Sequence, residues 1–421
     1  MTLPVVVAIP GPDEARLLAG WEPLRREVVV VRRCADVADV LAAAGAGLAR
    51  VVVLGADLPG CDTETVASLQ RWRVGLLVLL PAGPDGEQAE RRWRSLGVTR
   101  FAVAGRPASE LAREVALAVV DDNGPTPEAV EDSVAEPVSS GRGRTLAVWG
   151  PHGSCGRTTI AVNVAAELAV SGNSVLVVDA DTRGAAVGQA LGMLDEAPGL
   201  LAAVRSAADG RLDAAALQRH LAVAAPDLAV LTGASEPARW SEVRPAAFRR
   251  VLEIGSLVHD WTVVDLPGGL DDLGQEGGRD AVTATAAEAA DVVLVVGTAD
   301  PVGLQRFVRA WSRLPELAPE AFVVPVVNRV RSSAVGTPAV RRTTSLLRRL
   351  AGVEDVVALP DDVAADTALL AGRTLPEHAA RSPLRRALRD LAGRVEVVAD
   401  APEDLGGPDG TRRFDPLLAR S

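Results

Sequence analysis

Residues 145–172 read TLAVWGPHGSCGRTTIAVNVAAELAVSG, and this stretch decides the fold. A short apolar segment, Thr145–Trp149, precedes a loop with three glycines, and a segment with helical periodicity follows the loop. In the order strand, glycine loop and helix, the backbone N–H groups of the loop and of the helix start can bind phosphate. The stretch therefore predicts a phosphate-binding loop in an α/β domain.

The loop departs from the usual phosphate-loop spacing, which places four residues between two glycines, followed by Lys and then Ser or Thr. Five residues separate Gly150 from Gly156, and Arg157 stands at the lysine position. A plain glycine turn before a helix is an alternative explanation for this segment taken alone. Because all 44 basic residues of the chain are arginine, the absence of lysine here carries little weight.

Two later segments place aspartates where a phosphate-bound metal would need them. SVLVVDADTRG (174–184) ends a predicted strand at Asp179 and continues to Asp181, and WTVVDLPGG (261–269) ends another at Asp265. Mg²⁺ takes oxygen ligands, and carboxylates at strand ends beside a phosphate loop supply them. Each aspartate alone is equally compatible with a helix cap or a surface charge. The three segments in this order favour a magnesium site.

With these segments the chain resembles the MinD/ParA family of P-loop ATPases. That family combines a glycine loop ending Gly-Lys-Thr-Thr, a DxD at the second strand and a later strand ending Asp-x-Pro. The resemblance covers about residues 145–395 and includes ADVVLVVGTADPVGLQR (290–306), VVNRVR (326–331) and the segment 359–392. It implies a P-loop NTPase fold, a parallel sheet with helices on both faces.

The resemblance also implies roles for individual residues. The loop and the first helical turn would bind the phosphates of ATP through Gly150, His152, Gly153, Ser154, Cys155, Gly156, Arg157, Thr158 and Thr159. The Thr158 hydroxyl, Asp179 and Asp265 would hold Mg²⁺ and its waters. Asp181 would orient the attacking water and Arg157 would assist catalysis. Adenine would face Asn328 and the backbone near Pro360 and Asp361.

Two departures from the family pattern lead to a further prediction. Family members carry a second lysine early in the loop, which reaches the partner's nucleotide in an ATP-dependent dimer, whereas this chain has Pro151 and His152 there. His152 supplies a charge only when protonated. Arg157 keeps the positive charge but is larger and planar. We therefore expect a homodimer that binds ATP and hydrolyses it slowly or not at all.

The N-terminal part alternates short apolar segments with helical segments and predicts a flavodoxin-like parallel sheet. Its predicted strands are Leu3–Ile9, Glu27–Val31, Arg50–Leu54, Val74–Leu80 and Thr99–Ala104. VVVLGADLPGCD (51–62) resembles a response-regulator receiver, but the position of the phosphorylated aspartate is Gly55 and that of the first acid pair is Ile9-Pro10. Ala82 and Arg106 stand near the positions of the expected hydroxyl and lysine. A domain without these groups lacks the chemistry for phosphoryl transfer.

The predicted organisation is therefore a degenerate receiver-like domain (1–120), a flexible linker (121–144), a MinD/ParA-like domain (145–396) and a disordered tail (397–421). In the larger domain the predicted strands are Thr145–Trp149, Ser174–Asp179, Leu228–Leu231, Trp261–Asp265, Asp291–Val296 and Phe322–Val327. The pair of domains resembles the CpaE/TadZ proteins, which position Tad-type pilus secretion machinery. That resemblance implies an assembly or localisation factor with a protein partner.

Composition limits the alternatives. The net charge of −11 gives no general reason to bind nucleic acid or anionic lipid, although a local basic patch is compatible with it. The absence of a long apolar run argues against a membrane span, and three scattered cysteines are typical of a cytoplasmic protein. A ParA-like partitioning ATPase, a MinD-like division-site ATPase and a nucleotide-free scaffold are the competing functions.

Overall fold

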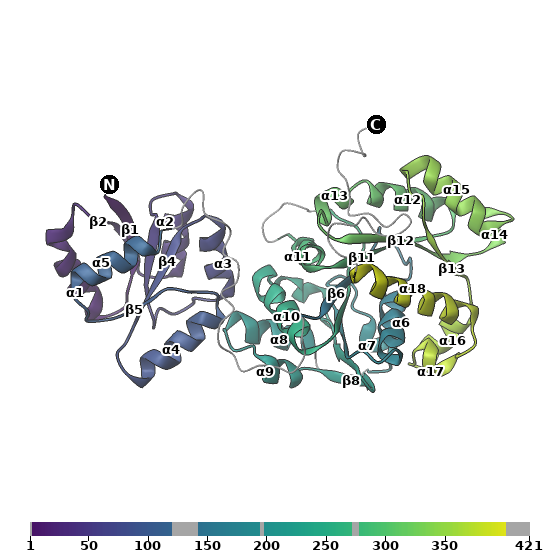
Figure 1. The fold of residues 1–421 in the computed structure, drawn as a ribbon, viewed down its shortest axis with the longest axis horizontal. Coiled ribbons are helices and arrows are strands. Elements are labelled where there is room, and N and C mark those ends of the chain that lie inside the picture. The colour runs from purple at the N-terminus through teal and green to yellow at the C-terminus, as the bar shows by residue number, and fades with distance from the viewer. Residues whose placement is uncertain (1, 120–141, 194–197, 272–277, 401–421) are drawn as a thin grey trace. The chain divides into compact units, whose positions relative to one another are not determined.

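The computed structural model describes residues 2–119, 142–193, 198–271 and 278–400. The chain divides into two compact units, one of residues 1–140 with 206–212 and the other of the remaining residues. Nearly all of the predicted linker, and the predicted tail from residue 401 onward, lie outside the described residues. Each unit is an α/β structure, as predicted (Figure 1).

The N-terminal unit is built on a five-stranded parallel sheet with the order β2-β1-β3-β4-β5. This order is typical of flavodoxin-like doubly wound sheets. The strands are β1 (Leu3–Ala8), β2 (Val28–Arg33), β3 (Val51–Gly55), β4 (Gly75–Leu80) and β5 (Phe101–Val103). The helices are α1 (Pro12–Trp21), η1 (Glu22–Leu24), α2 (Val37–Gly45), α3 (Thr63–Arg71), α4 (Pro84–Ser95) and α5 (Ala108–Leu117).

Both faces of this sheet are covered. Val6, Val52 and Val78 point to one face and pack in a cluster with Trp93 of α4. The neighbouring residues along each strand point to the other face, where Trp21 of α1 is buried with them. Because side chains alternate along a strand, a continuous run of valine and leucine supplies both faces of a covered parallel sheet.

Gly55 ends β3 at the position that a receiver's phosphorylated aspartate would occupy. A Cβ atom added there would lie 2.8 Å from Pro10 Cδ and 3.2 Å from Ile9 Cα. The space needed by an acidic side chain is thus filled by the residues that replace the acid pair. This packing supports the expectation that the unit lacks phosphoryl-acceptor chemistry.

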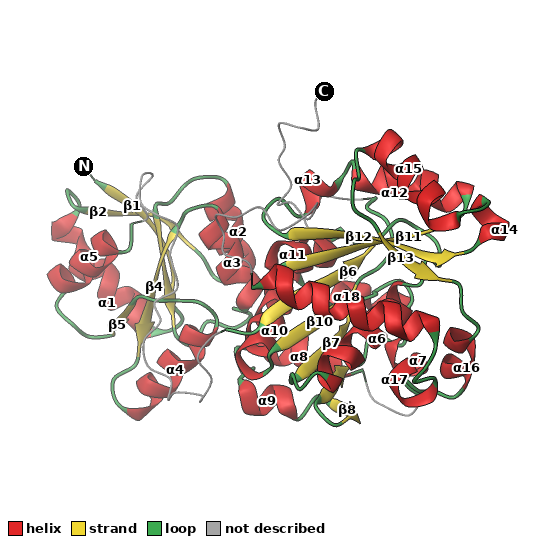
Figure 2. Cartoon of the chain, turned by 45° about the vertical axis from the view of Figure 1, so that its right-hand side comes forward, coloured by secondary structure: helices red, strands yellow, loops and turns green. Residues whose placement is uncertain are grey.

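The C-terminal unit is built on an eight-stranded sheet with the order β13-β12-β11-β6-β10-β7-β9-β8 (Figure 2). Seven strands are parallel, and only the edge strand β8 pairs antiparallel, with β9. The strands are β6 (Arg144–Trp149), β7 (Val175–Asp179), β8 (Ala222–Ala225), β9 (Leu228–Leu231), β10 (Trp261–Asp265), β11 (Val292–Thr298), β12 (Phe322–Val330) and β13 (Val357–Pro360).

Helices cover both faces of this sheet, with α6 and α18 on one face and α10, α11 and α12 on the other. The helices, in chain order, are α6 (Arg157–Val170), α7 (Val187–Ala190), α8 (Gly199–Ala208), α9 (Ala214–Gln218), η2 (Pro237–Glu242), α10 (Pro245–Val258), α11 (Ala281–Ala289), α12 (Pro301–Trp311), α13 (Leu314–Leu317), α14 (Ser332–Val335), α15 (Ala339–Ala351), α16 (Ala364–Leu370), α17 (Leu375–His378) and α18 (Pro383–Ala399). Within the described residues, none of these helices has the length and apolar character needed to cross a membrane.

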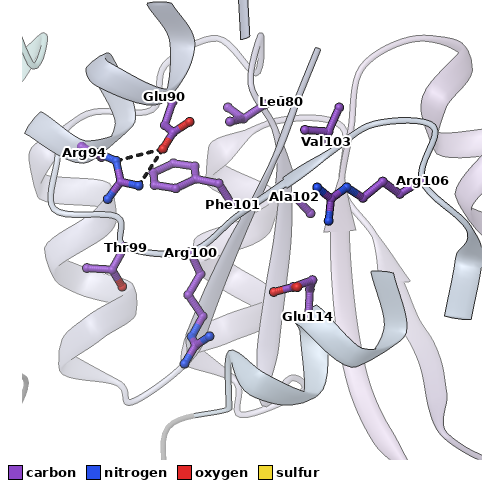
Figure 3. Close-up of a pocket in the computed structure, with 10 residues that line it drawn as sticks. All are labelled: Leu80, Glu90, Arg94, Thr99, Arg100, Phe101, Ala102, Val103, Arg106 and Glu114. Carbon is purple, nitrogen blue, oxygen red and sulfur yellow. Dashed lines mark hydrogen bonds and ion pairs between the residues drawn. The ribbon is translucent and has the colours of Figure 1, made fainter. Parts of the chain in front are cut away.

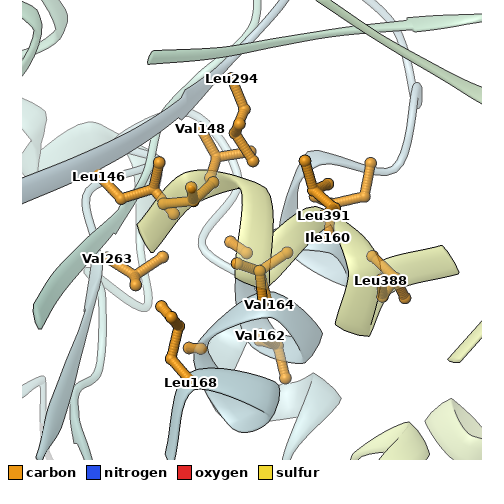
Figure 4. Close-up of a cluster of buried hydrophobic side chains, with 14 of the residues drawn as sticks. Leu146, Val148, Ile160, Val162, Val164, Leu168, Val263, Leu294, Leu388 and Leu391 are labelled. Atoms are coloured by element: carbon orange, nitrogen blue, oxygen red, sulfur yellow. The ribbon is translucent and has the colours of Figure 1, made fainter. Parts of the chain in front are cut away.

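Helix α6 is the centre of the larger core. Nine consecutive residues of α6, Ile160–Leu168, are buried, so the helix contacts protein on nearly every side. Figure 4 shows its side chains between Leu146 and Val148 of β6 and Leu388 and Leu391 of α18. Because the sheet lies on one side and α18 on the other, the start of α6 is held firmly where the loop meets it.

The predicted strands agree with the observed ones to within a few residues, and the structure adds two strands. The sequence analysis predicted neither β8, whose alanine-rich residues are largely outside the core, nor the short edge strand β13. Regular structure also extends beyond 145–396, since β6 begins at Arg144 and α18 continues to Ala399. Val398 and Ala399 are buried, so packing against the core explains why the helix continues.

Candidate functional site

The glycine loop links the end of β6 to the start of α6. Gly153 and Gly156 have φ values of 109° and 90°, a region that residues with a side chain rarely adopt. A Cβ on Gly156 would lie 2.4 Å from the amide nitrogen of Asn328, and one on Gly150 would lie 2.2 Å from the Val296 carbonyl oxygen. Both conformation and close packing therefore require glycine here.

No side chain caps the N-terminus of α6, which begins at Arg157 directly after Gly156. The first N–H groups of a helix have no acceptor within the helix itself. Together with the helix dipole they favour an anion at this end. The loop therefore has the local structure of a phosphate cradle, as the sequence predicted for this stretch.

Asp179 and Asp265 lie side by side at the ends of β7 and β10, where they are register partners in the parallel sheet. Their exposed fractions are 1% and 0%. The Thr158 hydroxyl donates a hydrogen bond to Asp265 Oδ2 at 2.6 Å, so the first turn of α6 contacts the carboxylate pair. Tertiary structure thus brings together the three residues that the sequence analysis assigned to Mg²⁺.

The carboxylate pair has an unmet need for positive charge. Asp179 Oδ2 accepts from the Val187 backbone N–H at 2.9 Å, whereas Asp265 Oδ1 is buried without a hydrogen-bond partner. Burial raises the pKa of Asp179 to about 7. Burial, and then the charge of Asp179, raises the pKa of Asp265 well above its ordinary value.

A divalent cation would satisfy this orphaned oxygen and stabilise both carboxylates in their charged form. Among the described residues, no group of three or more His, Cys, Asp or Glu side chains is placed to hold a metal ion. Mg²⁺ does not need such a cluster, since it is bound through one or two carboxylates together with phosphate oxygens and water. The donor set therefore fits Mg²⁺ held jointly with a phosphate ligand.

Arg157 is held by the loop itself. Its Nη1 donates to the carbonyl oxygens of Pro151 and Gly153, each at 3.1 Å, and its Nε donates to the Leu266 carbonyl at 3.0 Å. Nη1 also lies 3.2 Å from Cys155 Sγ, in a thiol whose pKa is raised by burial. A lysine ammonium could not make contacts in so many directions from one planar group.

Only Nη2 of this guanidinium is left to face outward, and it lies 3.9 Å from Asp181 Oδ2. Asp181 in turn accepts from the backbone N–H groups of Arg183 and Gly184 at 2.9 and 3.0 Å. The two residues predicted to be catalytic therefore lie next to each other across the loop. Whether Asp181 orients a water molecule stays a prediction.

The turn after β10 packs closely on the glycine loop. The Gly269 N–H donates to the Gly150 carbonyl at 2.9 Å, and the Trp149 indole N–H donates to the Gly269 carbonyl at 3.2 Å. A Cβ on Gly269 would lie within 2.0 Å of the His152 ring. The two glycines after Asp265 are thus explained by contact with the loop, a reason that the sequence analysis did not supply.

Three charged residues that the sequence analysis missed connect the loops around the site. Asp271 accepts from His152 Nε2 at 2.8 Å and from Arg183 Nη1 at 2.8 Å. Arg183 Nη2 donates to Asp280 at 2.7 Å, and Asp280 is fully buried. Arg183, Asp271 and Asp280 belong to three separate segments, so no local pattern in the sequence indicates their contact.

The residues predicted to face adenine are placed differently from one another. Asn328 reaches the loop, where its Nδ2 donates to the Cys155 carbonyl at 3.0 Å. Pro360 ends β13, and the Asp361 N–H donates to the Val330 carbonyl at 3.2 Å. Ser154 is exposed on the loop and Thr159 is partly buried in the first turn of α6. Adenine recognition by Asn328, Pro360 and Asp361 stays a prediction.

Two cavities line the described surface. One, of about 180 Å³, lies against residues 151–155 of the loop. The other, of about 300 Å³, belongs to the N-terminal unit beside β5, where Figure 3 shows the Arg94 guanidinium between Glu90 and the Phe101 ring. Its lining contains none of the receiver positions examined in the sequence, and it adds nothing to the chemistry at the phosphate loop.

The fold and the loop together define an α/β protein with a phosphate cradle at the carboxyl edge of a parallel sheet. Residues 146–375, more than half of the chain, match the CobQ/CobB/MinD/ParA nucleotide binding domain. The chain therefore belongs to this family of nucleotide-binding domains, and the predicted MinD/ParA relationship is confirmed. A comparison with curated proteins gives no match.

Solved structures agree with this assignment at the level of fold. A ParA family ATPase from Chlorobium tepidum TLS is 20% identical, with a TM-score of 0.51 over 59% of this chain and 98% of that one. The septum site-determining protein MinD complexed with Mg-ADP, from Pyrococcus horikoshii OT3, is 20% identical, with a TM-score of 0.49 over 61% and 97% of the two chains. The predicted fold class is confirmed.

Proposed function

We propose that this chain binds ATP with Mg²⁺ in the cradle formed by the glycine loop, the start of α6 and the carboxylates at the ends of β7 and β10. The observation that carries the proposal is the contact of Thr158 with Asp265, next to the unpartnered Asp265 Oδ1. In this role Thr158, Asp179 and Asp265 hold the metal and its waters, while the loop N–H groups bind phosphate oxygens. Bound Mg²⁺ would neutralise charge on the phosphates.

We infer slow hydrolysis from the arrangement of Arg157. Three of its contacts are to backbone carbonyl oxygens of the loop and of the turn after β10. These contacts hold the guanidinium in place, so it follows the phosphates poorly as charge develops during phosphoryl transfer. Arg157 in this arrangement favours a protein that senses nucleotide binding over one that turns ATP over rapidly.

The cellular role that we propose is a cytoplasmic assembly or localisation factor for Tad-type pilus or secretion machinery. Its support is the combination of units, a five-stranded unit without space for a phosphoryl acceptor at Gly55 and a MinD/ParA unit. In this role ATP favours a homodimer, and the dimer offers a different surface to its protein partner than the monomer does.

Calorimetric titration of Mg·ATP and Mg·ADP into the purified protein tests the nucleotide proposal. We expect binding that requires Mg²⁺ and is lost in Asp265→Asn, and a larger hydrodynamic size with Mg·ATP in gel filtration. Asp271→Asn serves as a matched control, because it removes an acidic charge near the loop but outside the metal set. Mg²⁺-independent affinity, or equal affinity in wild type and Asp265→Asn, would refute the proposal.

One observation favours the ParA-like alternative of non-specific DNA binding. Residues 301–353 contain nine arginines and only two acidic residues, although the whole chain is acidic. On α15 the side chains of Arg341, Arg342, Arg348 and Arg349 are exposed, and they line one face of the helix. Such a stripe fits a phosphate backbone.

Retention of duplex DNA at several salt concentrations separates this alternative from the pilus role. DNA binding that falls steeply with salt, and is lost when the four α15 arginines become glutamine, would favour the ParA-like function. No DNA binding at low salt would leave the localisation role. A MinD-like division function would need a membrane-binding segment; α18 packs in the core, and residues 401–421 lie outside the described residues. A protein that fails to bind any nucleotide would favour the scaffold.

A further inference from the structure

The cavity of about 180 Å³ beside the glycine loop has a lining unlike that of the carboxylate side. Loop residues 151–155 form one wall, the end of β11 and the start of α12 form another, and Arg329 closes a third. Pockets for drug-sized ligands and cofactors have volumes of about 300–1,000 Å³. The cavity therefore has room for one small group and not for a whole nucleotide.

Arg306 of α12 lies directly on the loop. Its Nη1 donates to the His152 carbonyl at 3.3 Å, and a Cβ on Gly153 would lie 2.7 Å from the same nitrogen. Arg306 thus brings a permanent positive charge to the loop segment where Pro151 and His152 supply none. Its remaining N–H groups have no partner among the described residues.

Arg329 at the end of β12 is held in an unusual conformation. Its φ of 55° is rare for a residue with a long side chain, and such strain concentrates at functional positions. Asn328 Oδ1 accepts from the Arg329 N–H at 2.8 Å, and Arg331 donates to its carbonyl at 3.2 Å. Since Asn328 also binds the Cys155 carbonyl, the backbone that aims Arg329 is tied to the loop.

The acidic group in the cavity does not neutralise these arginines. Asp300 accepts from the Thr298 hydroxyl at 2.7 Å and from the N–H groups of Val302 and Gly303 at 3.1 and 2.9 Å. The Thr298 hydrogen bond, followed by these backbone bonds, lowers the Asp300 pKa. Asp300 therefore caps α12, and neither Arg306 nor Arg329 forms an ion pair within the described part of the chain.

We propose that this cavity binds one phosphoryl group through Arg306 and Arg329, at a subsite separate from the nucleotide cradle. Guanidinium groups bind phosphate oxygens through paired N–H donors, and two of them flank a space of suitable size. An anion there contacts the outer side of the same loop whose N–H groups face the cradle. Its binding therefore stabilises the loop, and it does not require ATP to occupy the cradle.

Titration with inorganic phosphate, followed by ³¹P NMR and by thermal shift at matched ionic strength, tests the proposal. We expect saturable binding that persists when Mg·ADP is saturating, with at least tenfold lower affinity in R306Q/R329Q. The matched control R381Q/R386Q removes two exposed arginines at the start of α18 and should bind phosphate as wild type does. Equal affinity in the two double variants, or complete loss of phosphate binding with Mg·ADP, would overturn the subsite.

The source of the phosphoryl group is decided by a second titration. A second equivalent of ADP that binds to wild type but not to R306Q/R329Q would identify a nucleotide phosphate as the occupant. Phosphate binding without a second ADP would identify the free ion, and both results support the subsite. If ADP does not bind at all, the cradle proposal fails alone, and phosphate titrated into Arg157→Ala still tests Arg306 and Arg329.

Discussion

The Thr158 hydroxyl donates a hydrogen bond to Asp265 Oδ2 at 2.6 Å and thereby joins the first turn of α6 to the end of β10. These residues are far apart in the sequence, and the parallel register of β6, β7 and β10 brings them together. The same register sets Asp179 beside Asp265. The candidate metal site is therefore a product of sheet pairing, and the first predictions concern the free energy stored there.

Asp179→Asn should stabilise the protein in the absence of nucleotide and metal. Asparagine keeps the shape and an acceptor for the Val187 N–H, but it removes a buried charge next to Asp265. We expect a gain on the order of 1–3 kcal/mol in the free energy of unfolding at pH 8. Chemical denaturation measures it. The same variant should lose Mg²⁺-dependent nucleotide binding, and a destabilised variant would contradict this account.

The stability difference between Asp179→Asn and wild type should depend on pH. Because the Asp179 pKa is raised to about 7 from an ordinary value of 3.8, the folded protein holds this proton more tightly than the unfolded chain. Its stabilising contribution is complete below the ordinary pKa and is lost as pH rises through about 7. The advantage of Asp179→Asn should therefore grow between pH 5 and pH 8, by at most about 1.4 kcal/mol per pH unit.

Denaturation curves at several pH values, with and without Mg²⁺, test this dependence. Mg²⁺ should reduce the difference between the two proteins at pH 8, because a cation stabilises the charged Asp179 of the wild type. A difference that stays constant from pH 5 to pH 8 would mean that Asp179 is not the titrating group.

Arg157→Lys should increase the rate of ATP hydrolysis. The lysine ammonium cannot keep the contacts to Leu266 and to the loop carbonyls, so it is free to follow the phosphates. We expect about a tenfold or larger increase in kcat, on the order of 1.4 kcal/mol in the activation free energy. Phosphate release from Mg·ATP measures the rate. Arg157→Ala should weaken ATP binding and should not hydrolyse faster; a rate in Arg157→Lys no higher than that of wild type would contradict the prediction.

Arg183→Gln should destabilise the fold strongly, because Asp280 is fully buried and Arg183 is its ion-pair partner. Removing one partner of a buried pair costs about 3–5 kcal/mol. Arg205→Gln is a matched control, since its partner Glu242 is partly exposed, and such a pair contributes less than about 1 kcal/mol. Urea denaturation of the two variants compares these effects. Equal losses would show that burial of Asp280 does not depend on Arg183.

Gly55→Ala should destabilise the N-terminal unit by about 1–3 kcal/mol, because the new Cβ would lie 2.8 Å from Pro10 Cδ. The double variant Pro10→Ala with Gly55→Ala removes that contact and should recover part of the loss. Thermal unfolding of the four proteins forms a double-mutant cycle that isolates the contact. Independent, additive effects would mean that Pro10 does not fill this position.

Several elements followed from local sequence. Leu228–Leu231 and Trp261–Asp265 were predicted with the bounds observed, because short β-branched apolar runs bounded by polar residues have few alternatives. The alanine-rich β8 has no such signal, and its antiparallel pairing with β9 depends on a contact made only in the fold. Helix α18 continues past the predicted boundary for the same reason, since its last turn is buried.

By itself the sequence determined the two α/β units, the glycine loop and the aspartates that end strands, because periodicity and glycine conformation act over a few residues. Tertiary structure alone decided which groups meet. It placed Arg157 on loop carbonyls, Asn328 on the Cys155 carbonyl and Arg306 on Gly153. Such contacts depend on strand order and helix packing across long separations, and no local spacing in the chain encodes them.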